Sequence, residues 1–93
     1  MTIDLRDKVA IVTGAGRGIG REIAVTLGRE GVKTVGTDVD EDNLSDLGTE
    51  FEKSSLSGRQ HTCDVRDSSQ VRDVVDRTID EYGRIDILVN NAG

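Results

Sequence analysis

The chain of 93 residues carries 12 basic and 18 acidic side chains, which give a formal net charge of −6, and 34% of its residues are hydrophobic. This length allows one hydrophobic core. The acidic balance disfavours nucleic acid and anionic membrane surfaces as partners. The apolar run near the start is too short for a signal peptide or a membrane span, so we expect residues 1–93 to form one cytoplasmic unit.

The first half of the chain alternates between strand and helix patterns. Residues 8–13 (KVAIVT) form a short apolar and β-branched run, which is typical of a strand covered on both faces. A helix is expected from Gly18 until Gly31 ends it in a left-handed conformation. Residues 32–37 are expected to form a second strand. The first helix has apolar residues at helical spacing: Ile19, Ile23, Ala24 and Leu27.

A second helix and a third strand follow. Asp40 is expected to cap a helix that runs to about Ser54. Its apolar face consists of Leu44, Leu47 and Phe51. The third strand is short, at residues 60–63, and ends with the only cysteine, Cys63. A lone cysteine forms no internal disulfide and no thiolate cluster for zinc, so we expect Cys63 to be a packing residue and predict no metal site.

The third helix has the clearest pattern. Asp67 and Gln70 have capping-box spacing at its start, and Gly83 ends it. Its apolar stripe consists of Val71, Val74, Val75, Ile79 and Tyr82. Two charged pairs, four residues apart, are expected to form on its solvent face: Arg72 with Asp76, and Arg77 with Glu81. Residues 85–89 (IDILV) are expected to form the fourth strand.

Strands that alternate with helices predict successive βαβ units and an α/β fold with a parallel sheet. Right-handed crossovers and the Rossmann order give the strand order 3-2-1-4, with helices on both faces. The strand at residues 85–89 then lies at an edge, where a wholly apolar strand is unusual. We therefore expect an incomplete sheet, the N-terminal part of a single Rossmann dinucleotide-binding domain.

The loop between the first strand and the first helix reads TGAGRGIG, residues 13–20. Backbone N–H groups and the positive end of the helix dipole in such a loop can hold a pyrophosphate without a basic side chain. The alternative is a glycine-rich turn that binds no ligand. A simple turn would not need this many glycines, which cost entropy on folding. The common G-x-G-x-x-G pattern does not fit, because Ile19 takes the third place, and the Gly-Lys-Ser/Thr of a P-loop is absent.

The spacing Thr-Gly-x-x-x-Gly-x-Gly, with Gly14, Gly18 and Gly20 in the glycine places, resembles the short-chain dehydrogenase/reductase family. The other pieces of the family pattern follow successive strands: Asp38, then Cys63-Asp64-Val65, then Asn90-Asn91-Ala92-Gly93. The resemblance implies an oxidoreductase that transfers hydride between a nicotinamide cofactor and a carbonyl or alcohol substrate. It also implies a homo-oligomer when the enzyme is complete.

Asp38 and Arg17 bear on the choice between NAD and NADP. Asp38 is close to the place where an acidic side chain hydrogen-bonds the adenosine ribose and repels a 2′-phosphate; the alternative is a helix cap. Arg17 favours NADP, because a basic residue in the loop can bind that phosphate. We expect NAD, with NADP as the alternative. The loop residues expected to bind cofactor are Gly14, Ala15, Gly16, Arg17, Gly18, Ile19 and Gly20.

The resemblance implies roles for the residues after the third and fourth strands. Asp64 would accept a hydrogen bond from the adenine amino group, and Val65 would add a backbone contact; the alternative for Asp64 is an Asx turn. Asn90 would contact the adenosine ribose. The residues from Asn91 onward would join the fourth strand to the glycine loop, and the expected cofactor contacts there include Ala92 and Gly93.

The family's chemistry depends on a Tyr-x-x-x-Lys pair with a serine upstream, in which tyrosine transfers the proton. The only tyrosine, Tyr82, has Asp86 four residues later, and we expect it to be a packing residue. We therefore expect no catalytic residue in the chain and place all three beyond Gly93. The sequence leaves open two alternatives, a non-catalytic module that binds NAD and an inactive, truncated relic.

Overall fold

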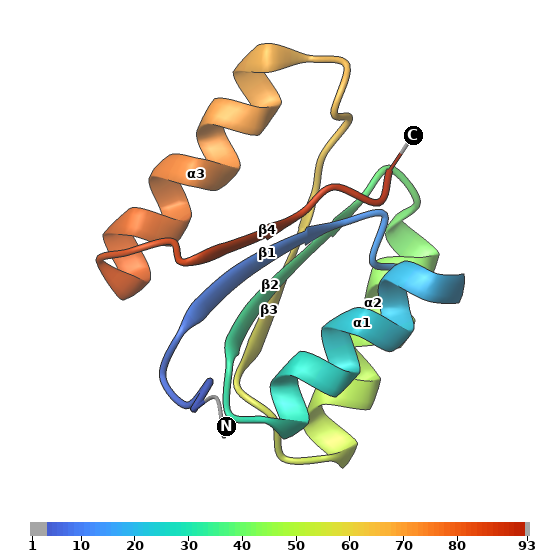
Figure 1. Cartoon of the computed structure of the whole chain (residues 1–93). Helices are drawn as coiled ribbons and strands as arrows, with labels where there is room; N and C mark the ends of the chain where they lie inside the picture. Colours follow the sequence, from blue (N-terminus) through green and yellow to red (C-terminus); the bar gives the residue numbers. More distant parts are fainter. Residues whose placement is uncertain (1–3, 93) are drawn as a thin grey trace.

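A computed structural model describes residues 4–92, in which strands and helices alternate along the chain (Figure 1). The elements are β1 (Val9–Thr13), α1 (Gly18–Arg29), β2 (Lys33–Asp38), α2 (Glu41–Lys53), β3 (Gly58–Thr62), α3 (Ser68–Tyr82) and β4 (Ile87–Val89). The predicted α/β class is therefore confirmed. Gly93, expected at the cofactor site, lies outside the described residues.

The four strands form one parallel sheet in the order β3-β2-β1-β4, which confirms the predicted Rossmann order. In this sheet Val12 of β1 pairs with Gly36 of β2 on one side and with Val89 of β4 on the other. All five residues of β1 are buried, as expected for a strand covered on both faces. Because all strands run in one direction, the loops that follow them meet at the same edge of the sheet.

All four strands differ by one or two residues from their predicted limits, and β3 and β4 differ most. β3 begins at Gly58, earlier than predicted, and its residues Arg59 and Gln60 are exposed. An edge strand can carry polar residues that face solvent, so the hydrophobic pattern of the sequence does not show where β3 begins. β4 covers only Ile87–Val89, and Asp86 just before it exchanges two hydrogen bonds with the main chain of Val9 at the start of β1.

Helices cover both faces of the sheet (Figure 1). Alternate residues of β1 contribute to two separate cores, since successive side chains of a strand point to opposite faces. The core beneath α1 and α2 consists of Val12, Ala15, Ala24, Val25, Leu44, Leu47 and Phe51. The core beneath α3 is smaller and consists of Ile11, Val35, Cys63 and Val74. Cys63 is thus a packing residue, as predicted.

The buried face of α1 is different from the predicted one. Its buried residues are Gly20, Ala24, Val25 and Gly28. Ile23 and Leu27 are partly buried against the same core, but Ile19 is 74% exposed. Ile19 lies in the first turn of the helix, ahead of the buried positions, so the prediction that it belongs to the apolar face is wrong.

The predicted ends of α2 and α3 are confirmed. The Asp40 side chain accepts a hydrogen bond from the N–H of Asn43 at 3.0 Å and caps α2. The Asp67 side chain accepts one from the N–H of Ser69 at 2.9 Å and caps α3. Gly83 ends α3 in the left-handed region, with φ of 78°. Side-chain oxygens therefore satisfy N–H groups at the start of both helices.

The charged residues of α3 pair differently from the prediction. Neither expected pair forms within residues 4–92: Arg72 with Asp76, and Arg77 with Glu81. Instead Arg77 Nε lies 3.0 Å from Asp73 Oδ2, and Arg59 Nε of β3 lies 2.8 Å from Glu81 Oε1. An acidic residue one turn before a basic one is the favoured orientation on a helix, and this explains the choice of Asp73.

The apolar face of α3 is only partly covered. Val74 and Thr78 are buried, but other apolar residues on α3 and on β4 remain exposed: Val71 (38%), Val75 (37%), Ile79 (43%) and Leu88 (67%). Several of these side chains line a mostly apolar cleft of about 260 Å³ between α3 and the sheet. None of the helices in residues 4–92 has the length and apolar character needed to cross a bilayer.

Candidate functional site

The residues singled out from the sequence meet at the carboxyl edge of the sheet. A cleft of about 270 Å³ at this edge is lined by Gly14, Asp38, Val39, Cys63, Asp64, Val65, Arg66 and Ala92. They come from the loops after all four strands. Val39 and Arg66 were not predicted from the sequence, although each directly follows a residue that was, Asp38 and Val65. Among residues 4–92 no group of three His, Cys, Asp or Glu side chains could hold a metal ion.

The loop has four glycines, and the three in the motif places, Gly14, Gly18 and Gly20, are needed for different reasons. Gly14 and Gly18 have positive φ, 63° and 59°, which favours glycine. A Cβ on Gly14 would also lie 3.0 Å from the Asn91 side chain. A Cβ on Gly20 would collide with the carbonyl oxygen of Gly14, whereas nothing lies within 4 Å of a Cβ built on Gly18. The loop therefore packs tightly at Gly14 and Gly20, whereas the space beside the Cα atom of Gly18 is empty.

The start of α1 has unsatisfied hydrogen-bond donors. Its N-cap, Arg17, is extended and makes no side-chain cap, and no acidic residue occupies the first turn. Asp40 and Asp67 cap the other two helices of the described chain. First-turn N–H groups without a cap, together with the helix dipole, form a binding site for an anion. The open space at Gly18 gives such an anion room, so the loop fits a pyrophosphate.

The Thr13 hydroxyl joins the glycine loop to the end of β4. Its oxygen accepts hydrogen bonds from the N–H groups of Asn91 and Ala92, both at 3.0 Å. The Asn91 side chain in turn donates to the carbonyl oxygen of Gly14 at 3.3 Å. The expected link between the fourth strand and the loop is confirmed for these two residues. The part played by Thr13 was not foreseen, although Thr13 begins the motif.

Asp38 holds the glycine loop against the end of β2. Its Oδ2 accepts a hydrogen bond from the N–H of Gly16 at 3.0 Å, and its Oδ1 accepts one from the N–H of Asp40 at 3.1 Å. Asp38 is not the cap of α2, because Asp40 has that role. A Cβ on Gly16 would lie 2.6 Å from Cβ of Asn43 and 2.9 Å from the Asp38 carboxylate. Glycine at this place therefore permits the close approach of Asp38.

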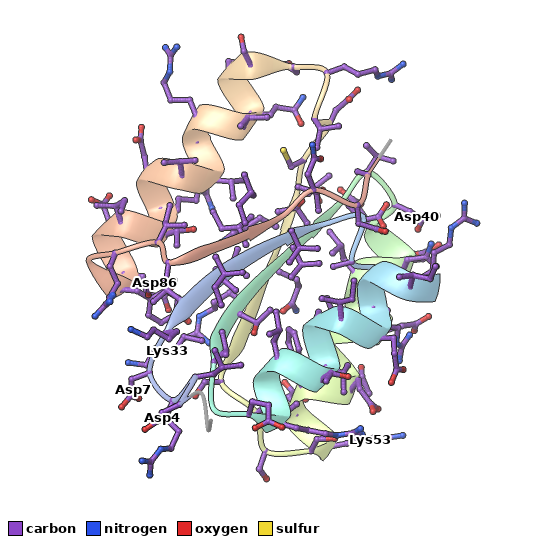
Figure 2. All side chains as sticks on the ribbon, in the orientation of Figure 1. Asp4, Asp7, Lys33, Asp40, Lys53 and Asp86 are labelled. Atoms are coloured by element: carbon purple, nitrogen blue, oxygen red, sulfur yellow. The ribbon has the colours of Figure 1, made fainter. Side chains whose placement is uncertain are left out.

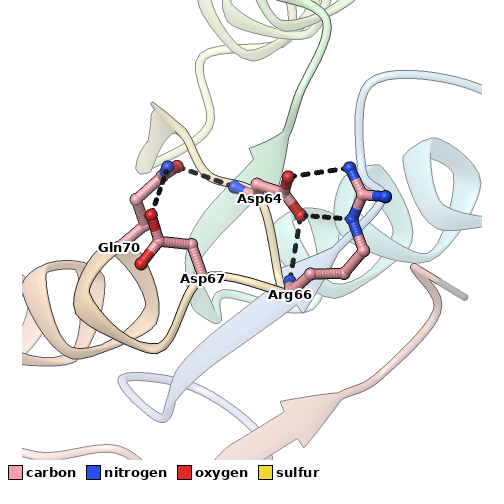
Figure 3. A network of polar contacts seen from close by, with 4 residues as sticks. All are labelled: Asp64, Arg66, Asp67 and Gln70. Carbon is pink, nitrogen blue, oxygen red and sulfur yellow. Dashed lines mark hydrogen bonds and ion pairs between the residues drawn. The ribbon is translucent and has the colours of Figure 1, made fainter.

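Asp64 lies in a network of hydrogen bonds at the end of β3 (Figure 3). Its Oδ1 accepts from the backbone N–H of Arg66 at 2.9 Å, so the Asx turn that was an alternative is present. The Arg66 guanidinium contacts both carboxylate oxygens, at 3.1 Å and 3.0 Å. These hydrogen bonds from Arg66 hold the pKa of the Asp64 carboxyl below its usual value.

The predicted capping box of α3 does not form, because the Asp67 side chain accepts from the N–H of Ser69 and not from that of Gln70. The Gln70 Oε1 accepts from the N–H of Asp64 at 2.8 Å, and its Nε2 donates to Asp67 Oδ2 at 3.1 Å. A complete capping box would have Gln70 accept from the N–H of Asp67. That N–H instead donates to the carbonyl oxygen of Asp64 at 2.9 Å. The first turn of α3 thus fixes the backbone on both sides of the Asp64 side chain.

Other predicted site residues lie away from this cleft or at its rim. Ala15 is fully buried in the core, and Ile19 and Arg17 are exposed at the start of α1. Asn90 lines the neighbouring apolar cleft. Tyr82 is half-buried against the core beneath α3, as predicted for a packing residue, and burial raises the pKa of its hydroxyl.

Comparisons with known proteins agree on one family. The family model described as short chain dehydrogenase matches residues 8–93. An uncharacterized oxidoreductase of Staphylococcus saprophyticus is 41% identical over 92 residues, which cover 98% of this chain and 39% of that protein. The chain therefore spans about two fifths of that relative's length.

Two solved structures that contain a cofactor have the same fold as this chain. A variant of actinorhodin polyketide ketoreductase with NADPH has a TM-score of 0.89 and 38% identity, over 100% of this chain and 35% of that one. A short chain dehydrogenase/reductase from Burkholderia phymatum in complex with NAD has a TM-score of 0.89 and 30% identity, over 94% of this chain and 31% of that one.

Proposed function

Because the chain belongs to the short-chain dehydrogenase family, we propose that residues 1–93 form the dinucleotide-binding part of a nicotinamide-dependent oxidoreductase and bind NAD in preference to NADP. The observation that carries this proposal is the uncapped start of α1 beside the open space at Gly18, at the edge where Asp38 and Asp64 also lie. A dinucleotide needs an anion site for its pyrophosphate and a polar site for its adenosine half, and these features supply the two.

The pyrophosphate would lie against the N–H groups of the first turn of α1, which no side chain satisfies. Gly18 provides the space for it, and the contacts of Gly14 and Gly20 keep the loop closed behind it. Ala15 would support the loop by packing, since its side chain is buried in the core beneath α1 and α2. The Thr13 bonds to Asn91 and Ala92 would hold the two loops at a fixed separation.

Asp38 supports NAD over NADP. Its carboxylate is held beside the glycine loop by two backbone N–H groups, and an oxygen so placed can accept a hydrogen bond from a ribose hydroxyl. The same negative charge would repel a 2′-phosphate. Arg17, exposed at the start of α1, would favour NADP, and the two solved relatives hold different cofactors. The choice of NAD therefore depends on Asp38.

Asp64 and Val65 are proposed to receive the adenine ring. The Asp64 carboxylate supplies an acceptor for the exocyclic amino group, and the Val65 N–H supplies a donor for the ring nitrogen next to it. The N–H of Val65 donates no hydrogen bond to another backbone group within residues 4–92. Asn90, Ala92 and Gly93 are proposed to complete the adenosine side of the site.

The bound nicotinamide would supply hydride chemistry to a carbonyl or alcohol substrate. The part of this chain in that reaction is to bind and orient the cofactor, since the sequence contains no Tyr-x-x-x-Lys pair. We propose that the proton-transfer residues and the substrate loop come from sequence outside residues 1–93, and that the complete enzyme is a cytoplasmic homo-oligomer.

Ile19 offers a test that separates cofactor binding from folding. It is exposed in the first turn of α1, where an acidic side chain interacts favourably with the helix dipole. Ile19→Glu is expected to keep the melting temperature or raise it, and to weaken NADH binding about tenfold or more by repelling the pyrophosphate. Ile19→Gln keeps the backbone N–H and adds no charge, so it is the matched neutral control and should bind NADH more tightly than Ile19→Glu.

Isothermal titration calorimetry with NADH and with NADPH measures these affinities. The proposal requires that the unaltered chain bind NADH, and bind it more tightly than NADPH. It would be overturned if the chain bound neither dinucleotide, or if Ile19→Glu and Ile19→Gln bound NADH equally well. A preference for NADPH would overturn the part given to Asp38 and would assign cofactor choice to Arg17.

A further inference from the structure

Arg66 follows the proposed adenine-binding residues and lines the same cleft. Its guanidinium makes a two-point contact with Asp64, through Nε to Oδ1 at 3.1 Å and through Nη2 to Oδ2 at 3.0 Å. Two parallel hydrogen bonds of this kind fix the plane of a carboxylate as well as its position. The side chain of Asp64 is thus held in one orientation at the wall of the cleft.

The bonds to Asp64 leave one acceptor position open. A carboxylate accepts about four hydrogen bonds, two on each oxygen. Oδ1 accepts two, from the backbone N–H and from Nε of Arg66, whereas Oδ2 accepts one, from Nη2. The Asp64 side chain is 30% exposed, so a donor from solvent or from a ligand can reach it. Arg66 therefore directs further hydrogen bonding to Oδ2.

The backbone of Asp64 is held as firmly as its side chain. Its N–H donates to Gln70, and its carbonyl oxygen accepts from Asp67. Gln70 is itself bonded to the Asp67 carboxylate (Figure 3). With the main chain fixed by the first turn of α3, Arg66 is the remaining group that determines where the Asp64 carboxylate lies.

Stability gives no reason for this arrangement. The Arg66 side chain is 87% exposed, and ion pairs at such positions add little to the free energy of unfolding. Asp4 and Arg6 form the same contacts, with Arg6 N and Nε each 3.0 Å from Asp4 Oδ1 and Nη2 2.8 Å from Oδ2. Asp4 lies at the other end of the molecule from Asp40 (Figure 2), which closely follows Asp38 and Val39 of the cleft. The Asp4–Arg6 pair is therefore a matched control for the Asp64–Arg66 pair.

We propose that Arg66 is a specificity-determining positioning residue, which presents Oδ2 of Asp64 to the exocyclic amino group of adenine and so selects adenine over hypoxanthine dinucleotides. This inference rests on the proposed cofactor function. Hypoxanthine has a carbonyl oxygen where adenine has the amino group, so it would place an acceptor against the fixed carboxylate and lose a hydrogen bond to a charged group.

The test is a calorimetric comparison of NADH with reduced nicotinamide hypoxanthine dinucleotide, which share the pyrophosphate and the nicotinamide. The unaltered chain should prefer NADH by about tenfold or more, the factor expected for one hydrogen bond to a charged group. Arg66→Ala should reduce this preference to about threefold or less, because only the backbone N–H of residue 66 then holds the carboxylate, through Oδ1, and Oδ2 can turn away from either base. Arg6→Ala should keep the full preference and a similar melting temperature.

Arg66→Lys separates charge from geometry. Lysine keeps the positive charge but lacks the planar two-point contact, so this variant should resemble Arg66→Ala in selectivity. Full selectivity in Arg66→Lys would overturn the geometric argument. The inference would also be overturned if Arg66→Ala kept the full preference, if it weakened both dinucleotides equally, or if the unaltered chain bound both with equal affinity. Failure to bind either dinucleotide would overturn the proposed function and this inference with it.

Discussion

Replacement of Asp38 by asparagine tests how the site selects its cofactor. The carboxylate accepts two backbone hydrogen bonds, from Gly16 and from Asp40. Asparagine has nearly the same shape but only one acceptor oxygen, so it keeps one of these bonds and presents an N–H₂ group to the other donor. We expect Asp38→Asn to lower the free energy of unfolding by about 1 kcal/mol, the net value of one hydrogen bond.

The same change should alter the two cofactor affinities in opposite directions. NADH loses a charge-assisted hydrogen bond to the ribose, which is worth about 1.5 kcal/mol or more and lowers its affinity about tenfold. NADPH is relieved of a repulsion of about 1 kcal/mol, the value for two unit charges about 4 Å apart in water. The ratio of NADH to NADPH affinity should therefore fall by between about 10-fold and 100-fold.

Asp40→Asn is the matched control for this prediction. It removes the same charge from the same loop, and asparagine caps a helix about as well as aspartate, so the cap on Asn43 should persist. Titration calorimetry of both variants with both cofactors, at one salt concentration, gives the ratios. The reasoning about Asp38 is refuted if its variant keeps the original ratio, or if the Asp40 variant changes the ratio as much.

Three further predictions concern folding and surface chemistry. Gly20→Ala should lower the melting temperature markedly in a thermal scan, because the new methyl group would collide with the Gly14 carbonyl oxygen. We expect the chain to self-associate through its exposed edge strand, and Leu88→Lys should reduce this association in analytical ultracentrifugation, since Leu88 is 67% exposed on β4. Asp86→Asn should weaken the dependence of stability on pH below about 4, because the Arg84 and Val9 hydrogen bonds lower the folded-state pKa of Asp86.

The sign of the pH effect follows from the lowered pKa. A carboxyl group whose folded pKa is below its unfolded value adds stability above the unfolded value, and this contribution is lost as the pH falls through the folded one. Asp86 lies at the opposite end of the sheet from Asp40 (Figure 2), so its loss should not affect cofactor binding. An Asp86 variant with an unchanged acid transition, a Gly20 variant with an unchanged melting temperature, or a Leu88 variant that associates as before would contradict the corresponding prediction.

The fold followed from the sequence because its local signals agree. β1 is apolar except for Thr13 and is buried throughout, and the caps at Asp40 and Asp67 lie where the helices begin. Handedness then leaves few arrangements of four parallel strands. The start of β3 was not recognisable, because Arg59 and Gln60 face solvent on an edge strand and have no apolar period.

The site was recognisable as a set of residues but not as a set of contacts. Motif spacing indicated Asp38 and Asp64, yet nothing in a linear pattern shows that Asp38 accepts from Gly16 or that Gln70 accepts from Asp64. Such bonds depend on which of several nearby donors is closest after folding. Ile19 shows the same limit. Its helical spacing predicted a place on the buried face of α1, but its side chain is exposed.

Chemical-shift mapping of the chain's backbone amides during titration with NADH tests the central claim most directly. We expect the largest changes at the N–H groups of Gly18 to Gly20, which would face the pyrophosphate, and at Asp64 and Val65, which would receive the adenine. The amides of α3 beyond its first turn should change little. Changes confined to the exposed face around Val75 and Leu88, or no changes at all, would contradict it.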